Sequence, residues 1–113
     1  MSDDLAVELM IMSGPDDGTI TRLDKPKHGE TYLLGRREDN DVILPYDSQI
    51  SRQHTRLFWM DGAWHVQDLD SRNGTYVGQQ KIDCVTRLAP GQMFRMGRTW
   101  LRLQPKQRGL VVG

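Results

Sequence analysis

The chain of 113 residues contains a single cysteine, Cys84. One cysteine excludes an internal disulfide and a cysteine-based zinc site, and it fits a reducing compartment. An excess of either charge is missing as well, because lysine plus arginine and aspartate plus glutamate number 15 each. A balanced chain has no global field that would attract nucleic acid or an anionic membrane. Any attraction for an anion must therefore be local.

Long apolar segments are also absent from the sequence. No apolar run approaches the ~20 residues that are needed to span a bilayer. The N-terminal residues 1–4 are acidic where a signal peptide would be basic. We therefore expect a soluble, cytoplasmic protein with neither a membrane nor nucleic acid as partner. Helical apolar stripes are interrupted throughout by glycine or proline, which disfavours helices.

Short strand signals separated by turn residues recur along the chain instead. They lie near residues 7–11, 19–23, 31–34, 42–44, 55–60, 64–69, 75–77, 81–82, 94–96 and 99–103. Asp61-Gly62 is a strong signal for a two-residue hairpin. Trp59, Trp64 and Trp100 alternate with polar neighbours, so we expect them in or beside the core. The pattern predicts an all-β sandwich over residues 1–104, followed by a tail or linker at 105–113.

Three short motifs follow strand signals and share one chemistry. They are Gly35-Arg36, Ser51-Arg52-Gln53-His54 and Ser71-Arg72-Asn73-Gly74-Thr75. Together they offer fixed positive charge, hydroxyl and amide donors, and glycines that let backbone N–H groups approach a ligand. They include no convincing base, nucleophile or metal cage. Such a set fits an oxyanion, above all phosphate, that is held rather than transformed, and we expect no catalytic residue, metal or cofactor.

Each motif also has a plainer interpretation. An arginine after a strand is commonly a solvated loop charge, and Asn-Gly is a common turn pair. Gly35 is expected to permit a backbone conformation that other residues cannot adopt. His54 could act as a base beside Ser51 and Asp68, but the Gly-x-Ser-x-Gly nucleophile elbow is absent. We therefore expect His54 to tie loops together through its ring nitrogens.

Taken in order, these pieces resemble the forkhead-associated (FHA) domain, a phosphothreonine-peptide-binding module. Gly35-Arg36 is similar to the family's Gly-Arg, and residues 40–44 are similar to its next strand. Residues 51–54 match its Ser-x-x-His, and residues 64–77 match its second half, including Ser-x-Asn-Gly-Thr. The resemblance spans nearly the whole chain. It implies a sandwich of two twisted antiparallel sheets, about eleven strands in all, with binding loops at one end.

The resemblance also implies roles for individual residues. Arg36, Ser51 and Arg52 would contact phosphate. Asn73 would hold the backbone of the bound peptide, and Arg72 lies where the family makes another loop contact.

Three further residues would be architectural in the resemblance: Gly35, His54 and Gly74. Gln49 lies near the position where some members read the third residue after the phosphothreonine. Because glutamine is uncharged, we expect no strong demand for aspartate at that peptide position.

The function implied is a phosphothreonine-dependent interaction module in Ser/Thr kinase signalling, with a Thr-phosphorylated protein or peptide as partner and no enzymatic activity. The alternative is a scaffold of the same fold that docks proteins without phosphate. Suitable residues at every donor position argue against that alternative. A hydrolase built on Ser51 and His54, or a nucleic-acid binder, is the remaining possibility.

Overall fold

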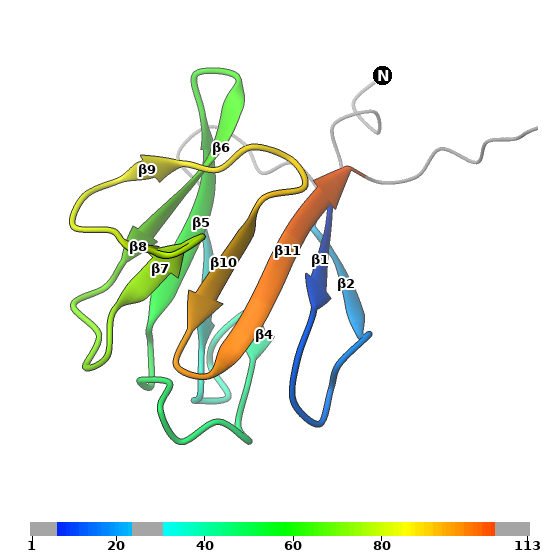
Figure 1. Ribbon diagram of the computed structural model, residues 1–113, viewed down its shortest axis with the longest axis vertical. Coiled ribbons are helices and arrows are strands. Elements are labelled where there is room, and N and C mark those ends of the chain that lie inside the picture. Colours follow the sequence, from blue (N-terminus) through cyan, green and yellow to red (C-terminus); the bar gives the residue numbers. More distant parts are fainter. Residues whose placement is uncertain (1–6, 24–30, 106–113) are drawn as a thin grey trace, which may run out of the picture.

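Two β-sheets make up the part of the chain that the computed structural model describes, residues 7–23 and 31–105 (Figure 1). The six-stranded sheet has the order β2-β1-β11-β10-β7-β8, and the five-stranded sheet has the order β4-β3-β5-β6-β9. The strands are β1 Val7–Ile11, β2 Ile20–Leu23, β3 Thr31–Gly35, β4 Val42–Ile43, β5 Thr55–Met60, β6 Ala63–Asp68, β7 Thr75–Val77, β8 Gln80–Lys81, β9 Thr86–Arg87, β10 Met93–Met96 and β11 Thr99–Pro105. The described residues include no helix of the length and apolar character that crossing a membrane would require. The expectation of an all-β sandwich is confirmed.

Most strands lie where the sequence predicts them. The β5–β6 hairpin turns at Asp61 and Gly62, whose φ angles of 52° and 77° are both positive, as a tight hairpin turn requires. The strand expected at residues 81–82 lies one residue earlier, and β9 was not predicted. β9 has only two residues and neither is apolar, so its pairing with β6 leaves no local signal. Residues 1–6 and the tail beyond residue 105 lie outside the described residues.

One edge pairing departs from the antiparallel pattern. β4 runs parallel to β3, with Leu34 opposite Val42 and Gly35 opposite Ile43. The loop between them returns alongside β3, where the backbone N–H of Asp41 donates to the Leu33 carbonyl at 2.8 Å. The Asp41 carboxylate accepts a second bond from the Leu33 N–H at 2.7 Å. These two bonds hold Asp41 beside Leu33, and β4 then runs in the same direction as β3.

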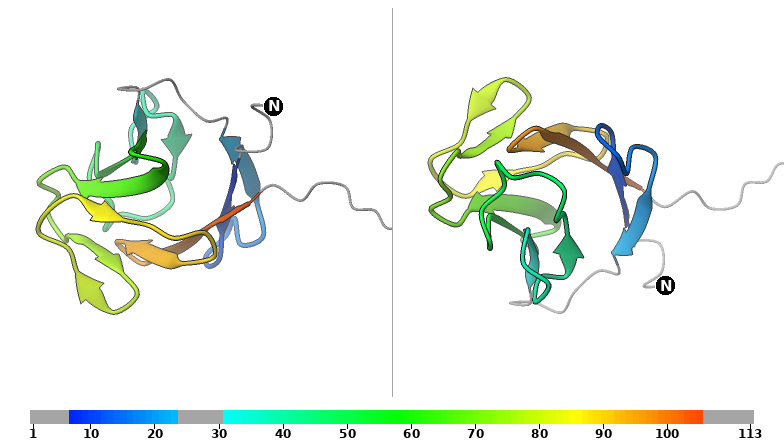
Figure 2. Two further views of the ribbon diagram at one scale, coloured as in Figure 1. Left: turned by 90° about the horizontal axis from the view of Figure 1, so that it is seen from above. Right: turned by 90° about the horizontal axis from the view of Figure 1, so that it is seen from below.

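The two sheets face each other (Figure 2). Apolar side chains from both sheets form the core between them. The six-stranded sheet contributes residues such as Leu9, Phe94 and Leu101, and the five-stranded sheet contributes Leu57 and Val66, all at most 1% exposed. Along strands such as β6 and β10, buried residues alternate with more exposed ones, as expected for a sandwich with one solvated face on each sheet.

The tryptophans follow the same alternation. Trp64 is buried in the core, while Trp59 and Trp100 are half-buried. The prediction of a place in or beside the core is confirmed for Trp64 and for Trp59, which packs against the core. It is wrong for Trp100, which lies beside Arg95 on the outer face of the six-stranded sheet.

The strand register gathers the three sequence motifs at one end of the sandwich. Leu34 at the end of β3 pairs with Thr55 at the start of β5, and Thr55 pairs with Asp68 at the end of β6. The hydroxyls of Thr55 and Thr75 lie 2.8 Å apart across the two sheets. Loops that leave these positions must therefore emerge together, at the lower end of the view in Figure 1.

Candidate functional site

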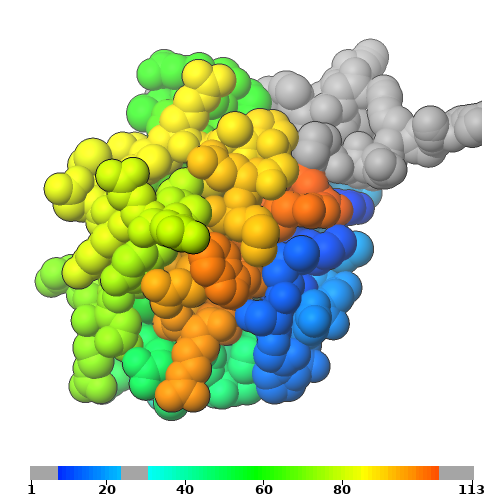
Figure 3. All heavy atoms as spheres, viewed as in Figure 1, coloured from blue at the N-terminus to red at the C-terminus, as the bar shows by residue number. Residues whose placement is uncertain are grey.

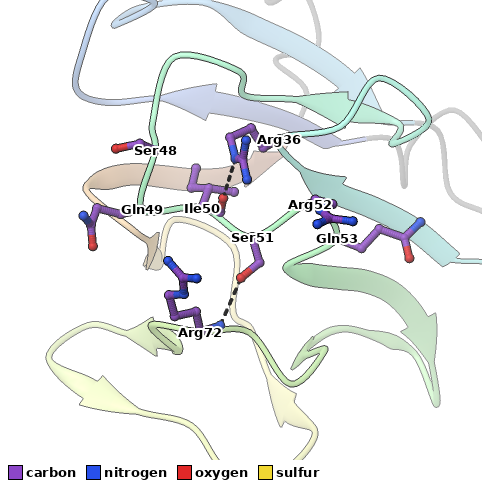
Figure 4. Close-up of a pocket in the computed structure, with 8 residues that line it drawn as sticks. All are labelled: Arg36, Ser48, Gln49, Ile50, Ser51, Arg52, Gln53 and Arg72. Carbon is purple, nitrogen blue, oxygen red and sulfur yellow. Dashed lines mark hydrogen bonds between the residues drawn. The ribbon is translucent and has the colours of Figure 1, made fainter.

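A pocket of about 320 Å³ lies at this loop end (Figure 4). Its lining consists of Arg36, Ser48, Gln49, Ile50, Ser51, Arg52, Gln53 and Arg72. Four of the five residues expected to contact a phosphopeptide are brought together here, and the fifth, Asn73, lies outside the lining. Neither aspartate nor glutamate lines the pocket. A local cationic site thus exists on a chain whose net charge is zero.

Arg36 enters the pocket directly after β3. Its Nε donates to the Ile50 carbonyl at 2.9 Å, and its backbone N–H donates to the Ser51 carbonyl at 3.1 Å. These bonds fix the base of the side chain, and neither terminal nitrogen of the guanidinium bonds to another of the described residues. Among the described residues no carboxylate forms an ion pair with it. A guanidinium held in this way offers two parallel N–H donors, the geometry that suits a phosphate.

Ser51 lies at the centre of the pocket in Figure 4, and its oxygen accepts a hydrogen bond from the backbone N–H of Arg72 at 3.0 Å. A hydroxyl that accepts in this way keeps its own proton available for donation. The same bond joins the loop before β5 to the loop before β7. The Ser51 hydroxyl is therefore fixed in place and ready to donate to a bound oxyanion.

Arg52 and Arg72 are both exposed. Neither guanidinium makes a hydrogen bond or ion pair with the described residues. In Figure 4, Arg52 lies on the Gln53 side of Ser51 and Arg72 on the Gln49 side. By contrast, Arg37 is neutralised by Asp39 at 2.8 Å and does not line the pocket. Three guanidiniums that no described carboxylate neutralises therefore lie around Ser51.

Gly35 is required here for space rather than for conformation. Its φ is not in the left-handed region, so the expected unusual backbone is wrong. A Cβ at this position would lie 2.2 Å from the Arg52 carbonyl oxygen and 2.8 Å from Nδ2 of Asn40. That Nδ2 donates to the Arg52 carbonyl at 2.7 Å. Glycine thus lets β3 pass against the loop that carries Ser51 and Arg52.

His54 is completely buried and bonds through both ring nitrogens. Its Nδ1 accepts from the Ser51 backbone N–H at 3.0 Å, and its Nε2 lies 2.8 Å from the Gly74 carbonyl. An accepting Nδ1 places the proton on Nε2, which then donates to Gly74. Burial lowers the pKa of His54, outweighing the opposite effects of the Gly74 carbonyl and of Asp68. The neutral ring therefore joins two loops and has no free nitrogen for the Ser51 hydroxyl.

Asp68 organises the loop before β7. Its carboxylate accepts bonds from the Ser71 hydroxyl at 2.5 Å, the Thr75 hydroxyl at 2.7 Å and the Ser71 N–H at 3.0 Å. Burial alone would raise the pKa of Asp68, but these hydrogen bonds outweigh it and hold the pKa below its usual range. Ser71 is thus used within the loop, where its oxygen also accepts from the Gly74 N–H at 2.8 Å.

Asn73 and Gly74 complete this loop. The Asn73 side chain donates from Nδ2 to the Gln49 carbonyl at 2.8 Å, which binds the two pocket loops to each other. Gly74 has a φ of 83°, and a Cβ there would lie 2.7 Å from Cε of Lys81. Such a backbone angle strongly favours glycine.

Asp47 holds one of the pocket loops in place, a role that the sequence did not predict. It is 5% exposed and accepts from the backbone N–H groups of Gln49 and Arg98 and from the Thr99 hydroxyl, at 2.7–2.9 Å. Burial would raise the pKa of Asp47, yet these bonds lower it overall. Asp47 therefore anchors the loop bearing Gln49 to the β10–β11 turn. The only local signal for this role is that an aspartate side chain can accept from the backbone N–H two residues later, as Asp47 does from Gln49.

Comparison with known proteins identifies the architecture and the motifs. A sequence model of the FHA domain matches residues 32–97. FHA domain-containing protein FhaB of Mycobacterium tuberculosis is 33% identical over 89 residues, which cover 79% of this chain and 57% of FhaB. The chain thus spans a little over half the length of that relative.

Solved structures of FHA domains are similar to this chain as well. The FHA domain of a Chlamydia trachomatis protein has a TM-score of 0.79 and 29% identity, covering 90% of this chain and 99% of that one. An FHA domain studied for its phosphothreonine-dependent interactions has a TM-score of 0.76 and 26% identity, covering 91% and 99%. The chain belongs to the FHA domain family.

Proposed function

We propose that this protein is a phosphothreonine-dependent interaction module that binds Thr-phosphorylated segments of partner proteins in Ser/Thr kinase signalling. Arg36, Ser51 and Arg52 would hold the phosphate, and Arg72 and Asn73 would contact the peptide beside it. Gly35, His54 and Gly74 would keep the loops in position. The domain would extend over residues 1–104.

One observation carries the proposal: exposed, unpaired guanidiniums surround a serine hydroxyl that retains its proton, in a pocket without a carboxylate. Holding like charges together without a counterion costs free energy. A phosphate group brings a charge of about −1.5 to −2 at neutral pH and three acceptor oxygens. It supplies both the charge and the acceptors that this pocket lacks.

The rigidity of the loops favours binding as well. The backbone around Ser51 is fixed by His54, Asn73 and Asp47 through bonds of 2.7–3.0 Å. Loops that are ordered before the ligand arrives lose little conformational entropy on binding. Related FHA domains support the same function, since one of them is described by its phosphothreonine-dependent interactions.

The geometry favours binding over catalysis. A serine nucleophile needs a base within hydrogen-bond reach of its hydroxyl. The Ser51 oxygen is instead bonded by the Arg72 N–H, and both nitrogens of His54 are occupied by backbone groups. We therefore propose that the phosphate is held and not hydrolysed.

A peptide library with phosphothreonine at its centre and randomised flanks tests the proposal. The matched library carries unmodified threonine. We expect the wild-type protein to retain peptides from the first library only, and calorimetry on one enriched peptide to show binding that disappears when its phosphate is removed. Equal binding of the two forms would contradict the proposal and favour a phosphate-independent docking scaffold.

A further inference from the structure

The pocket holds more positive charge than one phosphothreonine neutralises. Arg36, Arg52 and Arg72 all line it, and no acidic residue does. A single phosphate carries a charge of about −1.5 to −2, so the three guanidiniums would retain roughly one uncompensated positive charge in the complex. Arg36 and Arg52 with the Ser51 hydroxyl already offer enough donors for three phosphate oxygens.

Arg72 is the arginine placed to act outside the phosphate. Its backbone N–H is fixed on the Ser51 oxygen at 3.0 Å, but its side chain extends to the Gln49 side of Ser51, away from Arg52 (Figure 4). The next residue, Asn73, donates to the Gln49 carbonyl at 2.8 Å and so ties the loop of Arg72 to the loop of Gln49. On the Gln49 side of Ser51, Arg72 is therefore the charged residue that lines the pocket, and Gln49 is neutral.

We propose that Arg72 selects ligands that carry a second negative charge beside the phosphothreonine. The proposal rests on the phosphothreonine-binding function above and defines its ligand class more narrowly. The second group is an oxyanion, either a carboxylate of aspartate or glutamate or a second phosphate. Both present paired oxygens to a guanidinium. The added charge compensates the excess left by Arg36, Arg52 and Arg72 around one phosphate.

The test is a titration of one phosphothreonine peptide with neutral flanks against variants that carry glutamate, or a second phosphothreonine, at each of the neighbouring positions in turn. For wild-type protein we expect a gain of roughly two- to fivefold for the best-placed carboxylate. A second phosphate should give roughly tenfold. Both gains should shrink at high salt, because the contact is exposed. The two peptide series distinguish a carboxylate from a phosphate as the natural group.

The variants Arg72→Gln and Arg72→Lys assign the gain to this side chain. The measured quantity is the ratio of the affinities for the acidic and the neutral-flank peptide. Arg72→Gln should bring this ratio close to one even if binding of the neutral-flank peptide weakens, whereas Arg72→Lys should keep part of the gain. Arg87→Gln is the matched control: Arg87 is exposed on β9, does not line the pocket, and its loss changes the net charge equally. That variant should keep the full gain.

The outcomes separate the two proposals. Phosphate-dependent binding without any gain from an acidic neighbour, or with a gain that survives in Arg72→Gln, overturns the role of Arg72 and leaves the proposed function intact. Failure of every peptide to bind in a phosphate-dependent way overturns the proposed function itself, and the role of Arg72 with it.

Discussion

Two arginines on the sheets, Arg95 and Arg56, have environments opposite to those of the pocket arginines on the loops. Arg95 on β10 lies over the Tyr76 ring at 4.2 Å and over the Trp100 ring at 5.7 Å, and donates to the Gly97 carbonyl at 2.6 Å. These side chains cover the outer face of the six-stranded sheet, the face viewed in Figure 3. Arg56 on β5 likewise stacks on Phe58 at 4.2 Å. At the loop end, Arg36 has one such partner, a carbonyl, and Arg52 and Arg72 have none among the described residues.

The difference shows where the fold uses its cations for stability and where it leaves them for a ligand. A guanidinium on an aromatic face gains from both packing and charge. The pocket arginines have no such packing or charge partner among the described residues. The loops that carry them are nevertheless held by hydrogen bonds to His54, Asp47 and Asp68. At the loop end, the buried side chains of His54 and Asp47 are hydrogen-bonded, while the guanidiniums on the surface keep donors for a ligand. This is the arrangement expected of a binding site.

The largest effect on binding should come from removing a pocket arginine. Arg36→Ala should weaken phosphopeptide binding by about 2–5 kcal/mol, because the phosphate loses a charged partner in the bound state. The melting temperature should be nearly unchanged. Calorimetry with an enriched phosphopeptide and a thermal melt measure the two quantities, and unchanged affinity would remove Arg36 from the site.

Arg95→Ala is the matched variant on the sheet. It should lower the free energy of unfolding by about 0.5–1 kcal/mol, the usual contribution of an exposed cation–π contact, while peptide affinity stays the same.

His54 should have the next largest effect, on stability. His54→Ala leaves the Ser51 N–H and the Gly74 carbonyl without partners in a buried place, which costs about 1–3 kcal/mol for such a group. Because burial lowers the pKa of His54 in the folded state, stability is fully present above the ordinary value of about 6.5. It should fall as the pH drops below that value and through the folded-state pKa.

Urea unfolding at a series of pH values between 7.5 and 5 measures that slope. His54→Gln should flatten it, because a glutamine does not titrate in this range. A slope that survives in His54→Gln would show that another group carries the acid sensitivity.

A smaller effect should distinguish what the loop end recognises besides charge. One peptide carrying phosphothreonine should bind roughly tenfold more tightly than its phosphoserine form, because the extra methyl gains about 0.8 kcal/mol on burial and β-branching restricts χ1 before binding. An aspartate in the same place should bind much more weakly than either, since it lacks the tetrahedral group and the second charge. Equal affinity for the two phosphorylated forms would leave charge alone as the basis of recognition.

Among the substitutions that weaken binding, Ser51→Ala should give the smallest loss, roughly 0.5–1.5 kcal/mol, because a neutral hydroxyl contributes less than a guanidinium. Parallel titrations of Ser51→Ala and Arg36→Ala with the same peptide test the order. If Ser51→Ala were the more damaging variant, the hydroxyl and not the unpaired charge would dominate the site.

Much of this protein follows from local sequence. Alternation of apolar residues predicts the long strands because a strand with one buried face needs that period. Asp61-Gly62 predicts its hairpin because few residue pairs tolerate two positive φ angles. The Ser51–His54 and Ser71–Thr75 motifs predict an anion-binding loop end because their side chains combine charge with short-range donors. These are properties of neighbouring residues.

Other features depend on residues that are distant in the chain. β9 is a strand only because β6 offers it hydrogen bonds, and the start of β4 is held beside β3 by the bonds between Asp41 and Leu33. The need for glycine at position 35 arises from the Arg52 carbonyl, 17 positions later in the sequence.

The sequence by itself determined the all-β class, the main strands and the chemical character of the loops, because each depends on the types and spacing of residues that are neighbours in the chain. Tertiary structure alone decided which arginines remain unpaired, that Asp47 supports the pocket through Arg98 and Thr99, and that Arg72 and Arg52 lie on opposite sides of Ser51. The physical reason is that a hydrogen bond or ion pair depends on distance in space, and the register of two packed sheets sets that distance.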